Sequence, residues 1–515
     1  MRTITLKNIY KSFGPTLALD GVGFTLEEGA RLAIVGENGA GKSTLLKIVS
    51  KRLEADDGEL YGLDAGCSYI AQDFSGSPDD SPYAFLASRL SNPNKAIPLL
   101  EESGFELGTS QERLKGARCR DLSGGELKKL EIVVGLAEAS LFLALDEPEN
   151  HLDYHTIEWL VGKLKSYKGG LIFISHDQYL IDELADTILE LASGKLTVYT
   201  MRYQEYLDEK VRQIQGEGRQ WEVERKTIER LHKTVEMLKM KTRVSDSGVA
   251  TYRQTKRRYE ELKENHGDRP RSEVDKPKVR LNSVDRKGGK LLVEIKGVDF
   301  SYDSKHILDH VDAELRFGEK VVLFGRNGSG KSTLLKLITG ELTPASGSVR
   351  LGTDVSYQIM TQDHLAGLDP NDSALAVTER LLKLNETQAR ASLRRYGLSP
   401  GAMDKPLKIL SGGQQARFKL ALTFAQNPEF LILDEPTNHV DPPTWDAIVE
   451  AIQSFPGTVL AITHDRAFID AIADKLWILE GHTIKEHLGS LSDYLAPPKP
   501  LFEAPDDYHD YLASS

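Results

Sequence analysis

The residues best suited to chemistry lie in a glycine-rich segment that occurs twice in the 515-residue chain. Residues 36–44 read GENGAGKST, and residues 325–333 read GRNGSGKST. Both fit the pattern G-x-x-x-x-G-K-[S/T], in which backbone N–H groups surround a phosphate and the following helix points its positive end at the anion. The lysine would reach the β- and γ-phosphates, and the serine would hold Mg²⁺. The candidate nucleotide contacts are Gly36, Asn38, Gly39, Gly41, Lys42, Ser43 and Thr44 in the first copy, and Gly325, Asn327, Gly328, Gly330, Lys331, Ser332 and Thr333 in the second.

A pair of carboxylates follows an apolar strand in each half of the chain. Residues 141–147 read LFLALDE, and residues 430–435 read FLILDE. The Asp suits a Mg²⁺-bound water, and the Glu suits general-base activation of an attacking water. A histidine ends another apolar strand about 30 residues later in each half, where it could contact the γ-phosphate. The candidate catalytic residues are therefore Glu147, His176, Glu435 and His464, and the candidate metal ligands include Ser43, Asp146, Ser332 and Asp434.

These segments recur at a nearly constant offset. Lys42 and Lys331 lie 289 residues apart, and Ser123 and Ser411 lie 288 residues apart, as do the Asp and His residues of the two sets. Apolar runs at 31–35 and 320–324 precede the glycine-rich loops, and amphipathic helices are expected to follow them. The sequence therefore predicts two homologous α/β halves, each able to hydrolyse a nucleotide.

A third repeated element completes each set. Residues 122–126 read LSGGE and residues 410–414 read LSGGQ, each before a charged helix and 23 residues ahead of the Asp-Glu pair. With the phosphate loops, this arrangement resembles the ATP-binding cassette (ABC) ATPase superfamily over both halves. The resemblance implies an ATPase that uses ATP and Mg²⁺ and has two P-loop domains. It also implies that the Leu-Ser-Gly-Gly signature of one half closes over the nucleotide held by the other. Physically, the signature is a helix N-terminus that offers N–H groups to an anion.

The resemblance assigns further residues. Gln72 and Gln362 match the glutamine of the family that contacts the metal or its water, and Phe13 and Tyr302 match the aromatic that stacks on adenine. One composite site would join the first half's set to Ser411 and Gly413. The other would join the second half's set to Ser123 and Gly125. The first half has Glu149 where the second has Thr437, and Val440 replaces the usual leucine, so unequal rates at the two sites are expected.

About 80 residues separate the halves, and their pattern is helical. Ile214, Trp221, Ile228 and Val235 lie seven residues apart, which indicates a heptad seam. A turn-like segment at 244–250 follows, and then a second helical run. We expect an antiparallel α-helical hairpin, with a first helix of about 35 residues or roughly 50 Å. Its basic tip carries the candidate RNA contacts Lys239, Lys241, Arg243, Arg253, Lys256, Arg257 and Arg258.

Two fused cassettes with a helical linker resemble the ABC-F subfamily. The resemblance implies a ribosome-associated translation factor whose linker reaches from the tRNA exit site toward tRNA and rRNA, in translational regulation or in antibiotic resistance by ribosome protection. It implies a monomer whose two cassettes pair within the chain. The expected boundaries are 1–202 for the first ABC ATPase domain, 203–285 for the linker, 286–498 for the second ABC ATPase domain and 499–515 for a flexible acidic tail.

Composition narrows the alternatives. No window reaches the roughly 18 apolar residues of a spanning helix, and the two cysteines, Cys67 and Cys119, are too few for a disulfide framework or a four-cysteine zinc site. We therefore expect a cytoplasmic protein without membrane insertion. The runner-up is the cytoplasmic ATPase subunit of an ABC transporter, which gives the basic hairpin no role. DNA-repair and chromosome ATPases need zinc cysteines or longer coiled coils, and a non-enzymatic binding module would not need two complete catalytic sets.

Overall fold

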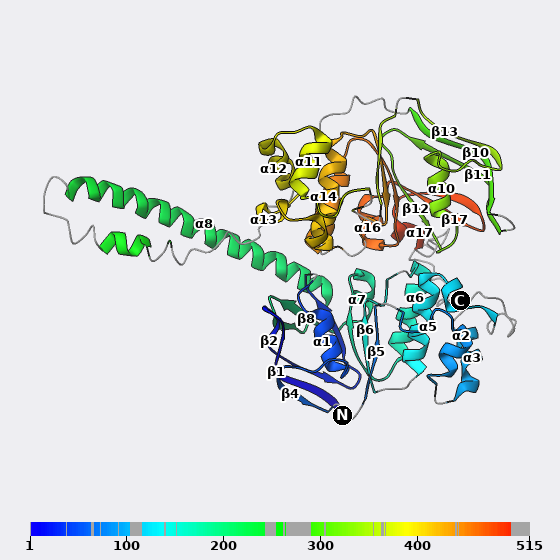
Figure 1. Ribbon diagram of the computed structural model, residues 1–515, viewed down its shortest axis with the longest axis horizontal. Helices are drawn as coiled ribbons and strands as arrows, with labels where there is room; N and C mark the ends of the chain where they lie inside the picture. Colours follow the sequence, from blue (N-terminus) through cyan, green and yellow to red (C-terminus); the bar gives the residue numbers. More distant parts are fainter. Residues whose placement is uncertain are drawn as a thin grey trace, which may run out of the picture. The chain divides into compact units, whose positions relative to one another are not determined.

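The structure is a computed structural model, and its helices and strands are shown in Figure 1. It describes residues 2–37, 39–62, 66–72, 74–90, 92–102, 116–137, 141–150, 152–242, 254–260, 263, 290–302, 305–353, 355–361, 365, 367–437, 440 and 442–495. The chain divides into two compact units, which we describe separately. The first unit draws on Met1–Asn282, Met360–Asn427 and Thr437–Phe455, and the second on Ser283–Ile359, Pro428–Pro436 and Pro456–Ser515.

A six-stranded sheet in the order β5-β6-β7-β3-β8-β9 forms the centre of the first half. All neighbouring strands pair in parallel except β8 and β9, which pair antiparallel. Successive residues of the inner strands alternate between two buried hydrophobic clusters, one on each face, which explains their unbroken apolar sequences. The strands are β5 Cys67–Ile70, β6 Phe142–Asp146, β7 Gly170–Ile174, β3 Arg31–Val35, β8 Thr187–Ala192 and β9 Lys195–Tyr199.

An antiparallel sheet and a set of helices cover this centre. The sheet has the order β2-β1-β4, with β1 at Thr3–Phe13, β2 at Thr16–Glu27 and β4 at Asp57–Tyr61. Its apolar residues share a core with helix α1 and one face of the central sheet, whereas α6 and α7 pack on the other face. The helices are α1 Lys42–Val49, α2 Pro82–Ala87, α3 Ala96–Glu102, α5 Gly124–Ala137, α6 Tyr154–Ser166 and α7 Gln178–Leu184, with 3₁₀ turns at Pro93–Lys95 and Cys119–Asp121.

The linker begins with one long helix, α8, which runs over Tyr203–Thr242 (Figure 1). Its 40 residues exceed the length of about 35 that the heptads predict. Residues 254–260 are also helical, and Tyr259 stacks on His232 of α8 with ring centroids 5.3 Å apart. Val235 is buried on α8. The predicted turn at 244–250 lies outside the described residues, so the antiparallel hairpin stays a prediction.

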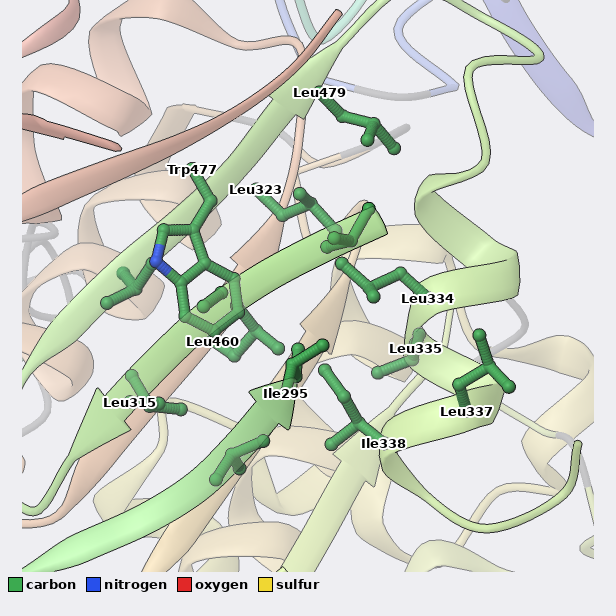
Figure 2. Close-up of a cluster of buried hydrophobic side chains, with 14 of the residues drawn as sticks. Ile295, Leu315, Leu323, Leu334, Leu335, Leu337, Ile338, Leu460, Trp477 and Leu479 are labelled. Atoms are coloured by element: carbon green, nitrogen blue, oxygen red, sulfur yellow. The ribbon is translucent and has the colours of Figure 1, made fainter. Parts of the chain in front are cut away.

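The second half repeats the topology of the first. Its central sheet has the order β14-β15-β16-β12-β17-β18, and its antiparallel sheet has the order β11-β10-β13. Figure 2 shows the shared core, in which Trp477 is fully buried among leucines and isoleucines. The strands are β10 Leu291–Tyr302, β11 Lys305–Arg316, β12 Lys320–Gly325, β13 Ser346–Leu351, β14 Tyr357–Met360, β15 Phe430–Asp434, β16 Thr458–Ile462, β17 Lys475–Glu480 and β18 Thr483–Leu488.

The helices of the second half belong to both units. Those of the second unit are α10 Lys331–Ile338, α16 Arg466–Ile472 and α17 Leu491–Leu495. Those grouped with the first unit are α11 Ala374–Leu382, α12 Glu386–Arg395, α13 Pro400–Met403, α14 Gly412–Ala425 and α15 Pro442–Gln453, with a 3₁₀ turn at Leu407–Ile409. The helical segment that carries the second signature is therefore grouped with the first unit, apart from the sheets of its own half. The expected tail at 499–515 lies outside the described residues.

Candidate nucleotide-hydrolysing sites

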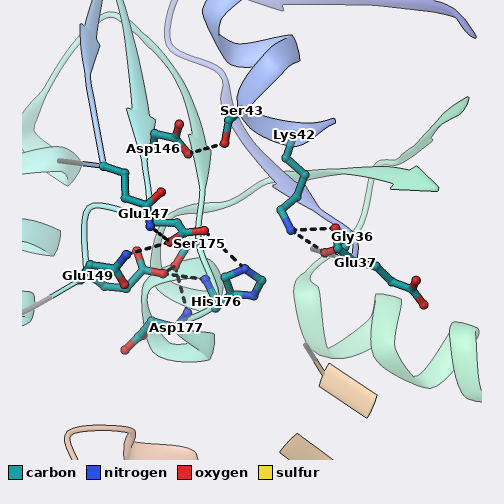
Figure 3. A network of polar contacts seen from close by, with 12 residues as sticks. Gly36, Glu37, Lys42, Ser43, Asp146, Glu147, Glu149, Ser175, His176 and Asp177 are labelled. Carbon is teal, nitrogen blue, oxygen red and sulfur yellow. Dashed lines mark hydrogen bonds and ion pairs between the residues drawn. The ribbon is translucent and has the colours of Figure 1, made fainter. Parts of the chain in front are cut away.

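The first phosphate loop joins the buried strand β3 to the N-terminus of α1. Gly41 is the N-cap of α1 with a φ of 101°, and a Cβ there would lie 2.7 Å from the carbonyl oxygen of Ala18. Lys42 is buried, and its ammonium donates to the carbonyls of Gly36 at 2.6 Å and Glu37 at 3.2 Å (Figure 3). The glycines thus let the backbone approach closely, and the lysine sits inside the loop that should hold phosphate.

The second loop has the same geometry. Gly330 caps α10 with a φ of 111°, and the buried Lys331 donates to the carbonyls of Gly325 at 2.8 Å and Arg326 at 2.9 Å. Thr44 lies in the first turn of α1, and Ser332 and Thr333 lie in the first turn of α10. The remaining expected loop contacts are Gly39 in the first half and Asn327 and Gly328 in the second, which lie in their loops, whereas Asn38 lies outside the described residues.

Asp146 ends strand β6 beside the first phosphate loop. The hydroxyl of Ser43 donates to its Oδ1 at 3.2 Å, and the hydroxyl of Tyr69 donates to its Oδ2 at 2.9 Å (Figure 3 shows the Ser43 contact). Asp146 is buried, and burial together with this aspartate raises the pKa of Tyr69. The Ser43 and Asp146 oxygens are the hard ligands that Mg²⁺ prefers, so this pair fits a magnesium site.

Glu147 contacts two other predicted site residues. Its backbone has a left-handed φ of 45°, and its N–H donates to the carbonyl of Ile174 at 3.0 Å. Its Oε2 accepts from the Gln72 side-chain amide at 2.9 Å and from Asn150 at 2.7 Å, and its Oε1 lies 3.7 Å from Nε2 of His176. The fold therefore brings Gln72, Glu147 and His176 together, although they come from distant parts of the sequence.

Glu435 repeats the backbone and histidine geometry of Glu147 in the second unit. Its φ is 49°, its N–H donates to the carbonyl of Ile462 at 2.8 Å, and its Oε1 lies 3.6 Å from Nε2 of His464. Burial raises the pKa of Glu435, with Lys331 opposing the shift and Asp434 adding to it. Burial also raises the pKa of Asp434. A carboxylate with a raised pKa is a stronger base, as activation of water requires. Gln362 lies outside the described residues.

Both signatures stand at helix N-termini. The N–H and hydroxyl of Ser123 donate to Glu126 at 2.8 and 2.7 Å, and Ser411 and Gln414 form the corresponding capping box before α14. Gly125 and Gly413 lie in the first turns of α5 and α14. Each signature thus presents a capped helix start whose next N–H groups are directed along the helix axis.

The two predicted adenine contacts are exposed aromatic rings at strand ends. Phe13 ends β1 with 53% of its surface exposed, and the Lys11 ammonium lies 5.8 Å from its ring centroid. Tyr302 ends β10 with 44% exposed and packs edge to face against Phe300. Exposure of a large ring leaves a face on which a base could stack.

Glu149, the first departure from the repeat, holds the segment that carries His176. Its Oε1 accepts from the backbone N–H of His176 at 2.6 Å and from the Ser175 hydroxyl at 2.8 Å (Figure 3). The residue is half-buried, but its carboxyl oxygen Oε2 is fully buried. Burial, with a smaller effect of Asp177, raises the pKa of Glu149 to about 7. The second half has Thr437 here.

Lys128 of α5 is a site residue that sequence analysis missed. It is 4% exposed, and its ammonium donates to the carbonyls of Ala71, Gln72 and Asp146. Burial lowers its pKa, and the surrounding carboxylates oppose that shift. The available signal was weak. The helix reads GGELKKLEIVVGLA, and its apolar residues surround it so fully that some charged residues had to be buried.

Comparisons with known proteins match both halves of the chain. The family model described as "ABC transporter" matches residues 19–150 and 308–438. The chain is 32% identical over 508 residues to the ATP-binding protein Uup of Buchnera aphidicola, covering 95% of this chain and 83% of Uup. It is 30% identical over 518 residues to the energy-dependent translational throttle protein EttA of Mycobacterium tuberculosis, covering 93% and 91%.

The chain belongs to the ABC-F subfamily of ABC ATPases. Its two cassettes imply binding and hydrolysis of ATP, so the predicted α/β twin-cassette fold and the ATPase activity are confirmed. Among solved structures, the archaeal ribosome recycling factor aABCE1, in complex with the ribosomal stalk protein aP1, superposes with a TM-score of 0.66 at 19% identity. That match covers 93% of this chain and 89% of aABCE1 and supports the fold. Among the described helices, none combines the length and apolar character that crossing a bilayer requires.

Proposed function

We propose that this ABC-F ATPase is a cytoplasmic, ribosome-associated translation factor that closes on two ATP molecules and opens on hydrolysis. The observation that carries the proposal is that the chain holds two hydrolytic sets, around Glu147 and Glu435, and that the long helix α8 separates them in the sequence. The name of the relative EttA, an energy-dependent translational throttle protein, supports a role in translation.

In the proposed closed state, each ATP lies between the two cassettes. The first is held by the Lys42 loop and by Ser411 and Gly413, and the second by the Lys331 loop and by Ser123 and Gly125. The capped helix starts at both signatures support this assignment because they offer positive helix ends to phosphate. Since each nucleotide would touch both cassettes, it binds the closed state more tightly and shifts the equilibrium toward it.

Hydrolysis at each site would rest on the glutamate at the end of its strand. Glu147 or Glu435 accepts a proton from the attacking water, and His176 or His464 contacts the γ-phosphate. Their proximity, at 3.7 and 3.6 Å, supports this division of roles. When bound, Mg²⁺ would neutralise phosphate charge. Ser43, Gln72 and Asp146 would hold it in the first site, and Ser332, Gln362 and Asp434 in the second.

The linker would carry the closure to an RNA target. A helix of 40 residues spans about 60 Å, long enough to reach far beyond a cassette. Of the candidate RNA contacts, Lys239 and Lys256 are half-exposed and pair with Glu236 and Glu260 of their own helices. Arg257 and Arg258 are exposed. The side chain of Lys241 and the residues Arg243 and Arg253 lie outside the described residues.

This function suggests a division of the chain for experiments. We propose a first ABC ATPase domain at 1–202, the linker at 203–285, a second ABC ATPase domain at 286–498 and an acidic tail at 499–515. The start of α8 at Tyr203 and of β10 at Leu291 supports the inner boundaries. We further propose that the protein acts as a monomer, with its two cassettes pairing inside one chain.

The test is a sucrose-gradient profile of the double variant Glu147→Gln, Glu435→Gln in cell lysate with ATP. The variant should still bind ATP but hydrolyse it at least a hundredfold more slowly, so it should accumulate in ribosomal fractions. The matched control is Lys42→Ala, Lys331→Ala, which should not bind ATP and should stay in the free fractions. In the trapped variant, RNA should crosslink to residues of the linker.

Two outcomes would contradict the proposal. The trapped variant could sediment with ribosomes no more than the loop-lysine control does. It could also co-purify with an integral membrane protein, which would favour the alternative role as the ATPase subunit of a transporter.

A further inference from the structure

The helix that begins at the first signature, α5, forms hydrogen bonds to the segment that carries Gln72. Lys128 lies on α5, and its ammonium donates to the carbonyl oxygens of Ala71 at 2.5 Å, Gln72 at 3.1 Å and Asp146 at 3.4 Å. An ammonium has three N–H donors, and here each has a carbonyl partner. Lys128 therefore joins three separate elements: the signature helix, the Gln72 segment and the end of β6.

Glu131, one turn further along α5, binds the same segment on the C-terminal side of Gln72. It is 5% exposed, and its Oε1 accepts from the backbone N–H of Ser75 at 2.6 Å. Lys128 holds carbonyls before and at Gln72, and Glu131 holds an amide after it. Charge-assisted hydrogen bonds are stronger than neutral ones, so the two residues fix both flanks of Gln72 against α5.

These hydrogen bonds also position the backbone next to Glu147. The Gln72 side-chain amide donates to Oε2 of Glu147 at 2.9 Å, and the carbonyl that Lys128 holds on β6 belongs to Asp146, the residue before Glu147. The three hydrogen bonds of Lys128 go to backbone carbonyls and not to either of these side chains. It holds the backbone on both sides of the Gln72–Glu147 hydrogen bond, and so it sets the distance over which that bond can form.

The sequence of the second cassette places different residues at these two positions. At the offset of 288 residues that relates the two signatures, Ala416 stands in place of Lys128 and Lys419 in place of Glu131. A methyl group cannot donate to three carbonyls, and a lysine cannot accept from an amide. The neighbouring Arg417 instead donates to Thr444 and to the carbonyl of Gly397. Side chains at these two positions of α14 therefore cannot form the hydrogen bonds that Lys128 and Glu131 form on α5.

We propose that Lys128 is a positioning residue of the first hydrolytic site, one that couples the signature helix to Gln72 and Glu147, and that Ala416 and Lys419 cannot supply the same coupling at the matching positions of the second cassette. The inference rests on the proposed hydrolysis at the Glu147 site. It would make the two sites unequal through the helices that follow their signatures. A movement of α5 would be transmitted to Glu147 through the Lys128 side chain, whereas the methyl group of Ala416 on α14 has no donor that could form such hydrogen bonds.

The experiment compares Lys128→Met, which keeps the aliphatic stem but removes the ammonium, with Lys128→Arg, which restores donors. The matched control is Lys129→Met, the same change at the next residue, whose ammonium lies over the ring of Trp159. Each variant is made in the full chain, alone and with Glu147→Gln or Glu435→Gln. ATP turnover is measured as kcat and KM.

In the Glu435→Gln background, only the first site hydrolyses ATP. There, Lys128→Met should lower kcat roughly tenfold and change KM by less than about twofold. It should have almost no further effect in the Glu147→Gln background, because both changes act on one site. Lys128→Arg should recover part of the loss, and Lys129→Met should resemble the parent in both backgrounds. Hydrogen exchange should rise at Ser75 in Lys128→Met and stay unchanged in β14.

An equal loss of kcat in both backgrounds would overturn the proposal, since it would mark Lys128 as a general support of the fold. Unchanged kcat in the Glu435→Gln background, where only the first site hydrolyses ATP, would also overturn it. Neither result depends on ribosome binding, so the proposal can fail while the proposed function stands. Conversely, a loss of ribosome binding by the double glutamine variant would leave these turnover results in force.

Discussion

Replacing Glu149 by glutamine should stabilise the first cassette at pH 8 and change it little at pH 5. The pKa of this carboxyl is raised from 4.5 to about 7, mainly by burial. Each pKa unit corresponds to about 1.4 kcal/mol, so the ionised carboxylate costs about 3 kcal/mol of unfolding free energy above pH 7. Between about pH 4.5 and 7 the folded state keeps a proton that the unfolded state has lost. Stability therefore falls as pH rises through that window.

Glutamine removes this penalty but brings one of its own. Its oxygen can still accept from the Ser175 hydroxyl and the His176 N–H, whereas its NH₂ group replaces Oε2, which is buried and has no hydrogen-bond partner among the described residues. An unpaired buried donor costs about 1 kcal/mol, so the net gain at pH 8 is about 2 kcal/mol. At pH 5 the two effects nearly cancel.

Calorimetric unfolding of the wild type and Glu149→Gln across pH 5 to 8 measures this difference. For a domain of this size, 2 kcal/mol corresponds to a midpoint shift of roughly 4–8 °C at pH 8. Glu28→Gln, at an exposed carboxylate of the same cassette, serves as the control and should shift the midpoint by less than about 2 °C. The reasoning is refuted if Glu149→Gln changes the midpoint equally at both ends of the pH range, or lowers it at pH 8.

Two further changes test the loop and the core. Gly41→Ala should weaken ATP binding at the first site at least tenfold, because its Cβ would lie 2.7 Å from the Ala18 carbonyl and its φ is 101°. Fluorescent-nucleotide titration measures this, and Gly162→Ala, which meets no atom within 4 Å, should bind normally. Trp477→Ala should cost about 3–5 kcal/mol because the ring is fully buried, with its Nε1 donating to Glu486 at 2.9 Å. Chemical denaturation should show this loss in the second cassette, Trp477→Phe should lose less, and equal stability of Trp477→Ala and wild type would contradict the packing argument.

Much of the fold could be predicted from the repeated motifs because each carries its own local physics. The glycine at position 41 is required by a left-handed backbone, and the apolar run before it is required by a strand buried on both faces. The Leu-Ser-Gly-Gly segments begin helices because serine caps them. Such signals are local in sequence, so they can be recognised without knowledge of tertiary contacts.

The contacts around Lys128 and Glu149 could not be predicted for the opposite reason. A lysine in a charged helix is usually solvated, and only the arrival of the Gln72 segment and the end of β6 turns it into a buried donor. The sequence marks Glu149 as an added charge, but its partner His176 lies 27 residues away on another strand end. Long-range polar contacts of this kind leave no periodicity for a sequence pattern to reveal.

The left-handed backbone at Glu147 and Glu435 restricts what evolution can do with these positions. Their φ values of 45° and 49° suit few residues with a side chain, and asparagine and aspartate adopt them most readily after glycine. A descendant that abandons hydrolysis at one cassette should therefore drift toward those residues and avoid valine or isoleucine, which would strain the bend. An inactive cassette would keep the left-handed backbone at this position after the glutamate itself had been replaced.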